Sequence, residues 1–205
     1  MITLALPKGR LANKAYELLK QIGYDCIAVE ADSRKLIIED EKNDIRYIMV
    51  KPSDVSIYVE HKAADIGIVG KDILMETGSN VYELLDLKIG KCKIAVAGKK
   101  NYIEDMSVPL KVATKYVKIT KDYFTRINRA IEIIKLNGSI ELAPLLGLSD
   151  VIVDIVETGT TLRENNLTIL SEISNSSARF IANKSSYQFM RQKIDKITHE
   201  LEMII

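Results

Sequence analysis

Cysteine and histidine are scarce in this chain, which has two of each among its 205 residues. Cys26 and Cys92 lie far apart, without CxxC spacing or a nearby histidine cluster, so neither a disulfide framework nor a zinc site is indicated. We expect both thiols to be reduced and structural. His61 and His199 fall on expected helices without an obvious acidic or nucleophilic partner. Covalent catalysis through a histidine-activated nucleophile is therefore not expected.

An excess of charge of one sign is also missing. The chain has 29 basic and 28 acidic side chains, a net charge of +1, with 47% hydrophobic and 28% charged residues. These proportions are typical of a soluble globular protein and argue against a general nucleic-acid binder. Any anion-binding site must therefore be local.

Long hydrophobic runs are absent, since no stretch approaches the roughly 20 apolar residues that span a bilayer. The apolar residues 2–6 have no basic region before them and are followed by Pro7, so they predict a strand and not a secretion signal. The sequence thus predicts a cytoplasmic protein without a membrane or nucleic-acid partner.

Several nucleotide and hydrolase motifs are missing as well. The chain has no G-x-x-x-x-G-K-[ST] loop and no G-x-G-x-x-G after its first strand, which argues against a Walker-type hydrolase and a dinucleotide-binding domain. It also lacks the G-x-S-x-G turn that carries a serine nucleophile.

The patterns that are present alternate between strands and helices, which predicts an α/β fold with mostly parallel strands. An apolar helical stripe follows Arg10 and closes at Gly23. Expected strands cover residues 2–6, 47–50 and 66–70, and then, after a restart, residues 92–97, 111–114, 131–136 and 151–156. We expect a first domain of residues 1–90 plus about 180–205, a second of residues 91–179, and a crossing at 77–90.

Other local expectations concern helix ends and faces. Ser53 and Thr120 are expected to cap helices, because hydroxyls accept hydrogen bonds from the first backbone N–H groups. A helix carrying Leu142, Leu145 and Leu146 is expected to end at Gly147, and residues 188–205 have the apolar spacing of an amphipathic terminal helix.

The most informative segment is VIVDIVETGTTL, residues 151–162, in which an apolar strand leads into a turn of glycine and threonine before a helix. Such a turn presents hydroxyls and backbone N–H groups, which bind phosphate. Asp154 interrupts the apolar run and needs a hydrogen-bonded partner, since burying an unpaired carboxylate is costly. A ribose diol and the nearby backbone are both open as partners, and the turn itself is also compatible with an ordinary capped helix.

Two further junctions carry charge. Glu141 follows Asn137-Gly138-Ser139 at a strand-to-helix junction, where it either stabilises the helix dipole or faces a ligand. Lys8, Gly9 and Arg10 follow the first strand and form a compact basic element suited to pyrophosphate, which arginine binds bidentately.

Together these motifs resemble those of ATP phosphoribosyltransferase in its short form. The resemblance extends over nearly the whole chain in family order, through LALPKGRL (4–11), ADIGIVGKD (64–72), KVATKY (111–116), LNGSIELAP (136–144) and DIVETGTTL (154–162). Lys51 departs from the family's common arginine, and Val117 from its common proline.

The resemblance implies two α/β lobes like type II periplasmic binding proteins, with the active site in the crevice between them and residues 168–184 as the returning strand. It implies transfer of phosphoribosyl from phosphoribosyl pyrophosphate to N1 of ATP, with Mg²⁺ on the leaving group and no protein nucleophile. The expected donor site has Asp154 on the ribose hydroxyls and Glu157, Thr158, Gly159, Thr160 and Thr161 on the 5-phosphate. The expected pyrophosphate or ATP contacts are Lys8, Gly9, Arg10, Arg34, Lys51 and Glu141.

The family also has long forms with a C-terminal histidine-binding domain, for which this chain is too short. The resemblance therefore implies a separate histidine-sensing regulatory subunit and a homo-oligomer of this chain. Two other readings remain open. A salvage-type phosphoribosyltransferase shares the acidic residue and Thr-Gly-Thr-Thr turn, although Ile155 replaces its usual second acidic residue. A two-lobed module that binds an anion without catalysis is the other.

Overall fold

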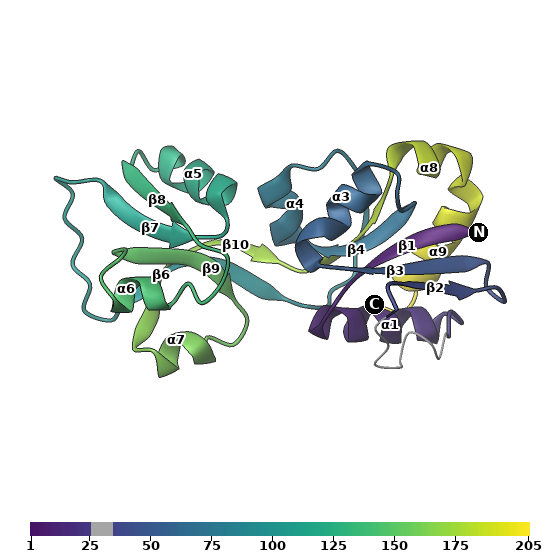
Figure 1. Ribbon diagram of the computed structural model, residues 1–205, viewed down its shortest axis with the longest axis horizontal. Coiled ribbons are helices and arrows are strands. Elements are labelled where there is room, and N and C mark those ends of the chain that lie inside the picture. The colour runs from purple at the N-terminus through teal and green to yellow at the C-terminus, as the bar shows by residue number, and fades with distance from the viewer. Residues whose placement is uncertain (26–34) are drawn as a thin grey trace. The chain divides into compact units, whose positions relative to one another are not determined.

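The computed structural model describes residues 1–25 and 35–205, which divide into two compact units (Figure 1). The first unit consists of Met1–Gly90 and Ser177–Ile205, and the second of Lys91–Ser176. Each unit has its own mixed sheet and its own helices, so the predicted α/β class is confirmed. Cys26 and Arg34 lie outside the described residues.

The first sheet has the strand order β2-β3-β1-β4-β11-β5. Its central strand β1 runs parallel to β3 and β4, whereas β2 is antiparallel to β3, and β11 is antiparallel to both β4 and β5. The strands are β1 (Ile2–Pro7), β2 (Ile37–Asp40), β3 (Ile45–Val50), β4 (Ile66–Gly70), β5 (Tyr82–Asp86) and β11 (Ala178–Ala182). The helices of this unit are α1 (Arg10–Gln21), η1 (Pro52–Asp54), α3 (Val55–Glu60), α4 (Lys71–Thr77), α8 (Lys184–Phe189) and α9 (Arg191–Glu202).

Both faces of β1 are largely buried, which explains why Thr3 is the only polar residue of this strand. Leu4 and Leu6 belong to a core cluster that includes residues of α1 and α9, whereas Ala5 belongs to a second cluster with Val55 and Val59 of α3. Successive side chains of a strand point to opposite faces, so one strand contributes to both cores.

The second sheet has the order β10-β6-β9-β7-β8. β7 is parallel to β8 and β9, whereas β6 is antiparallel to β9 and β10. The strands are β6 (Cys92–Lys99), β7 (Leu110–Thr114), β8 (Ile131–Lys135), β9 (Val151–Val156) and β10 (Leu167–Ser176), and the helices are α5 (Val117–Arg126), α6 (Leu142–Leu145) and α7 (Thr160–Glu164). The predicted strand 151–156 thus has the same bounds as β9.

The segments that connect the units differ from the expectation. Residues 77–90 are not a simple crossing, because they contain β5, which joins the first sheet beside β11. The expected returning strand 168–184 is two strands, since β10 belongs to the second sheet and β11 to the first. The terminal helix is likewise divided at Met190 into α8 and α9.

Two expected helix caps are wrong. Helix α5 begins at Val117, so Thr120 lies inside it and its hydroxyl donates to the carbonyl of Tyr116 at 2.6 Å. The Ser53 hydroxyl donates to Asp54 Oδ1 at 2.7 Å instead of accepting from a helix N–H. Helix α6 is short, and its buried residues are Ala143 and Pro144, whereas the leucines that suggested it are exposed.

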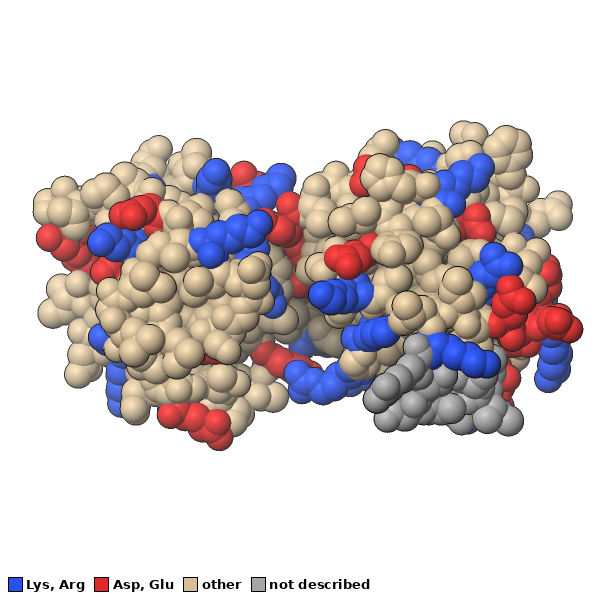
Figure 2. All heavy atoms as spheres, viewed as in Figure 1, with Lys and Arg blue, Asp and Glu red and all other residues tan. Residues whose placement is uncertain are grey.

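Charge is distributed as the composition predicts. On the face shown in Figure 2, basic and acidic side chains are interspersed over both units. Among the described residues, no helix combines the length and apolar character that crossing a bilayer requires.

Candidate functional site

Asp154 lies on β9 with its side chain 18% exposed. Its Oδ1 accepts a hydrogen bond from the backbone N–H of Ile155 at 2.8 Å. The ammonium of Lys115 lies 3.5 Å from the same oxygen. The carboxylate that interrupts the apolar strand therefore has both a backbone partner and a cation.

The electrostatic environment of Asp154 has opposing parts. Burial raises the pKa of its carboxyl above the ordinary value, while the Lys115 ammonium and the Ile155 N–H lower it. Glu141 raises this pKa further through its negative charge. Glu141 is the N-cap residue of α6, so the structure brings this predicted residue into the electrostatic environment of Asp154. Perturbed carboxyls of this kind are frequent at functional sites.

The threonine-rich turn after β9 is held by its own side chains. The hydroxyls of Thr158 and Thr160 are 3.0 Å apart. Arg163 donates from Nη1 to the Thr158 carbonyl at 2.9 Å and from Nη2 to the Thr160 hydroxyl at 3.0 Å. Thr161 is exposed, and its carbonyl accepts from Asn165 Nδ2 at 2.8 Å. The turn is thus ordered while hydroxyls face solvent.

Gly159 allows this turn to form. Its φ of +72° is in the left-handed region, where a side chain is disfavoured. A Cβ here would also lie 3.3 Å from Arg163 Nη1. The glycine therefore serves both the backbone conformation and the approach of the guanidinium.

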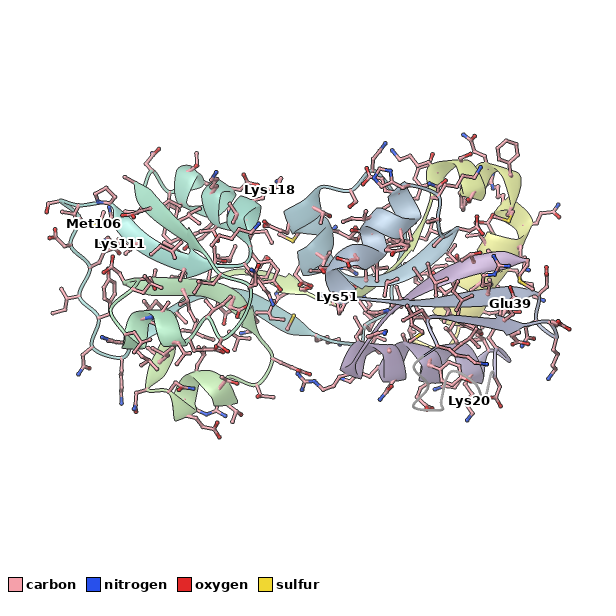
Figure 3. All side chains as sticks on the ribbon, in the orientation of Figure 1. Lys20, Glu39, Lys51, Met106, Lys111 and Lys118 are labelled. Atoms are coloured by element: carbon pink, nitrogen blue, oxygen red, sulfur yellow. The ribbon has the colours of Figure 1, made fainter. Side chains whose placement is uncertain are left out.

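The basic residues of the first unit follow two neighbouring parallel strands. Pro7 of β1 pairs with Val50 of β3, and the Lys8 N–H donates to the Val50 carbonyl at 2.8 Å. Lys8 and Lys51 therefore both follow the carboxyl ends of these parallel strands, and Figure 3 shows Lys51 beyond the end of β3. Both lysines and Arg10 are exposed.

The N-terminus of α1 begins at a glycine in the left-handed region. Gly9 is its N-cap residue with φ of +94°, and a Cβ there would have no neighbour within 4 Å, so the conformation and not space favours glycine. Within the described residues, the helix has neither a side-chain cap nor an acidic residue in its first turn. The Ala12 N–H donates to the Gly9 carbonyl at 2.9 Å, so the positive dipole end of the helix is the feature that favours negative charge here.

The predicted residues thus form two groups. Lys8, Gly9, Arg10 and Lys51 belong to the first unit, and Glu141, Asp154 and the turn belong to the second. Arg34 lies outside the described residues.

Sequence reasoning missed Lys115 and Arg163. Lys115 directly follows β7, the parallel neighbour of β9, and the register pairs Thr114 with Val153. Arg163 lies one helical turn after Thr160, and helical side chains point back toward the N-terminus. The pairing of β7 with β9 is the signal that identifies Lys115, and the direction of helical side chains is the signal that identifies Arg163.

The described residues contain no group of three or more histidine, cysteine, aspartate or glutamate side chains arranged to hold a metal ion. In each unit, the oriented N–H groups, hydroxyls and charged side chains described above are of the kinds that bind anions and hydroxyls.

Comparisons with known proteins agree with this chemistry. A family model described as ATP phosphoribosyltransferase matches residues 51–203. The ATP phosphoribosyltransferase of Brachyspira hyodysenteriae is 59% identical over 206 residues, covering 100% of both chains. That of Clostridioides difficile is 53% identical, covering 98% of this chain and 97% of the relative.

Solved structures give the same result. A chain of the ATP phosphoribosyl transferase (HisG:HisZ) complex from Thermotoga maritima matches with a TM-score of 0.87 and 36% identity, over 99% of this chain and 98% of that one. The VFT2 domain of Bordetella pertussis BvgS matches with a TM-score of 0.62 at 11% identity, over 100% of this chain and 87% of that one, which shows the fold alone. By its family model and its full-length relatives, the chain belongs to the ATP phosphoribosyltransferase family.

Proposed function

We propose that this chain joins N1 of ATP to the anomeric carbon of phosphoribosyl pyrophosphate, giving phosphoribosyl-ATP and pyrophosphate, the first step of histidine biosynthesis. The observation that carries this proposal is the partly buried Asp154 followed by an ordered, hydroxyl-rich turn, in a chain 59% identical to a full-length ATP phosphoribosyltransferase. We further propose that the reaction takes place in the cytoplasm.

The sugar donor is assigned to the second unit. Asp154 accepts hydrogen bonds from the ribose hydroxyls, and residues 157–161 bind the 5-phosphate through hydroxyls and backbone N–H groups. The ordering of the turn by Arg163 supports this assignment, because a preformed site loses less conformational entropy on binding.

The pyrophosphate and triphosphate oxygens are assigned to the first unit. Arg10 and Lys8 contribute charge, and the first turn of α1 contributes N–H groups and its dipole. Lys51 adds a third cation at the same end of the sheet, as a point charge without bidentate geometry. Glu141, expected among the pyrophosphate or ATP contacts, is instead assigned a weaker role at the donor site, because its charge acts on Asp154.

The reaction needs no covalent protein intermediate. The C1–O bond to pyrophosphate breaks with its electron pair leaving on oxygen, and the N1 lone pair of adenine forms the new C–N bond. Positive charge develops on the ribose, which nearby carboxylates stabilise, and orientation of the two substrates supplies much of the remaining rate. The chain's role is therefore positioning and electrostatics.

The divalent cation is proposed to be Mg²⁺ that arrives on the substrate phosphates. Mg²⁺ keeps several waters and binds through phosphates more often than in an all-protein cage. We assign no side chain of this chain to the ion. When bound, it neutralises charge on the leaving pyrophosphate.

An acceptor panel tests the proposal against its alternatives. Purified protein with its regulatory partner is given phosphoribosyl pyrophosphate, Mg²⁺ and either ATP or each free nucleobase, and pyrophosphate release is measured. We expect release with ATP only. Release with a nucleobase would favour the salvage enzyme, and binding without release would favour the anion-binding module.

Gly159→Ala is expected to raise the KM for phosphoribosyl pyrophosphate about tenfold. The left-handed conformation costs a non-glycine residue about 1–2 kcal/mol, and the new Cβ crowds Arg163. Gly138→Ala is the matched control, because Gly138 lacks the left-handed φ and a Cβ there meets nothing within 4 Å. Steady-state kinetics compares the two, and an equal KM change in both variants would contradict the role of the Gly159 turn.

We also propose that this chain forms a homo-oligomer and depends on a separate histidine-sensing regulatory subunit. The solved relative from Thermotoga maritima is a HisG:HisZ complex, which supports a second subunit. Activity of the chain alone is expected to rise at least about tenfold on adding that subunit, which corresponds to 1.4 kcal/mol. Inhibition by histidine is expected only in its presence. Histidine inhibition of the isolated chain would refute this dependence.

A further inference from the structure

We propose that Lys115 is a positioning residue for the sugar donor: its ammonium holds the Asp154 carboxylate charged and aimed, so that Oδ2 accepts the ribose hydroxyls. The inference rests on the proposed function, because ribose is the group that Asp154 is proposed to bind.

The place of Lys115 is fixed by the backbone. β7 and β9 are parallel neighbours, and their register pairs Thr114 with Val153. Lys115 and Asp154 are therefore the residues that follow this pair along the two neighbouring segments. The buried Thr114 hydroxyl donates to the Val153 carbonyl at 2.7 Å and accepts from the Tyr116 N–H at 2.9 Å. The chain on either side of Lys115 is therefore tied to β9.

The side chain of Lys115 is also held. Its ammonium lies 4.8 Å from the centroid of the Tyr116 ring, within the range of a cation–π interaction. Tyr116 is itself 1% exposed, so the ring is a fixed platform. A lysine held between an aromatic ring and a carboxylate loses less conformational freedom when the ion pair forms.

The two oxygens of Asp154 have different surroundings. Oδ1 faces Lys115 and accepts from Ile155 N–H. Among the described residues, no hydrogen-bond donor is found for Oδ2, although the side chain is 18% exposed. Because Lys115 and the Ile155 N–H both contact Oδ1, the carboxylate is held in an orientation in which Oδ2 can accept the ribose hydroxyls.

The charged groups that act on Asp154 oppose one another. Burial and the negative charge of Glu141, at the start of α6, raise the pKa of Asp154, whereas Lys115 after β7 and the Ile155 N–H lower it. Lys115 is the only side-chain cation in this set. Its removal therefore raises the pKa of Asp154 further, and removal of the Glu141 charge lowers it.

The first readout needs no substrate. Carboxyl-¹³C-aspartate NMR follows the titration of Asp154, whose signal is identified by its loss in Asp154→Asn. We expect Lys115→Met to raise the pKa of Asp154, Lys115→Arg to restore it, and Glu141→Gln to lower it. Lys121→Met, which removes an exposed lysine of α5, is the control and leaves the titration unchanged.

The second readout is binding in the complex with the regulatory subunit. Lys115→Met is expected to weaken phosphoribosyl pyrophosphate binding about tenfold, in line with the loss of one charged contact, with ATP binding unchanged. The acid limb of the affinity profile moves to higher pH, and Lys115→Arg rescues most of the loss. A purely structural role predicts equal losses for both substrates and no pH shift.

An unchanged Asp154 titration in Lys115→Met, with wild-type donor binding intact, would overturn this inference and leave the proposed function standing. A wild-type protein that binds no phosphoribosyl pyrophosphate would instead refute the proposed function, and with it the sugar-positioning role, even if the Asp154 titration shifts.

Discussion

Asp154→Asn is expected to weaken binding of phosphoribosyl pyrophosphate about 100-fold while changing ATP binding by less than about threefold. A carboxylate that accepts hydrogen bonds from two hydroxyls contributes about 1.5–3 kcal/mol, and the amide keeps the shape but loses the charge. Isothermal titration of each substrate measures the difference. Thr161→Ala should show the same preference with a smaller, roughly fivefold effect, because it removes one neutral hydrogen bond.

The matched control is Asp150→Asn, at the other end of β9. Asp150 Oδ2 accepts a hydrogen bond from the Lys111 N–H at 2.8 Å, and an asparagine oxygen can replace it. Binding of both substrates should stay within about twofold of wild type for this surface change. Equal loss of donor and ATP binding in Asp154→Asn would contradict the assignment of Asp154 to the ribose.

The stability of Asp154→Asn shows whether its loss of phosphoribosyl pyrophosphate binding comes from a lost contact or from misfolding. Since burial raises the pKa of Asp154, the folded chain holds its proton to higher pH than the unfolded chain does. The contribution of this group to the free energy of unfolding therefore falls as pH rises from the ordinary carboxyl pKa through the raised one. Asp154→Asn removes this dependence, so the variant should be at least as stable as wild type at neutral pH, as thermal melts can check.

Arg10→Ala is expected to lower kcat/KM about 100-fold, the second large effect. Arg10 begins α1 at a helix end that has no acidic residue in its first turn, so its guanidinium is proposed to bind pyrophosphate oxygens alongside the N–H groups. Two charged hydrogen bonds of about 1.5 kcal/mol each account for the loss. Steady-state kinetics with both substrates varied provides the measurement.

Arg10→Lys distinguishes charge from geometry. Lysine keeps the charge but not the planar pair of donors, so about a tenth of the activity should return. Lys20→Ala, near the far end of the same helix, should leave kcat/KM within about twofold. Full activity in Arg10→Lys would show that charge alone suffices, and full activity in Arg10→Ala would remove Arg10 from the site.

The fold was predictable where a structural position strongly favours one type of residue. The strand 151–156 and the glycine after α1 match the structure. Burial of Val151, Ile152, Val153 and Val156, and the left-handed backbone of Gly23, each leave a direct mark in the sequence. The leucines near α6 did not predict a buried face, since Ala143 and Pro144 provide the buried contact. A helix of four residues is too short for periodicity to identify its inner face.

Site residues that are contiguous in sequence were predictable, whereas contacts between separate segments were not. Asp154 and the threonine turn are contiguous in sequence, whereas Lys115 approaches Asp154 only through the pairing of β7 with β9. Arg163 was visible in the sequence, but its bond to Thr160 depends on the direction in which helical side chains point. Strand order is tertiary information, which a single sequence does not state, whereas the direction of helical side chains follows from local geometry.

The most direct test of the proposed reaction is pyrophosphate release measured in an omission series, with the product followed by the ultraviolet absorbance of N1-substituted adenine. The complex with the regulatory subunit receives phosphoribosyl pyrophosphate alone, ATP alone, or both, each with Mg²⁺. We predict release and the new absorbance only when both substrates are present. Release with phosphoribosyl pyrophosphate alone, without the adenine product, would contradict the account.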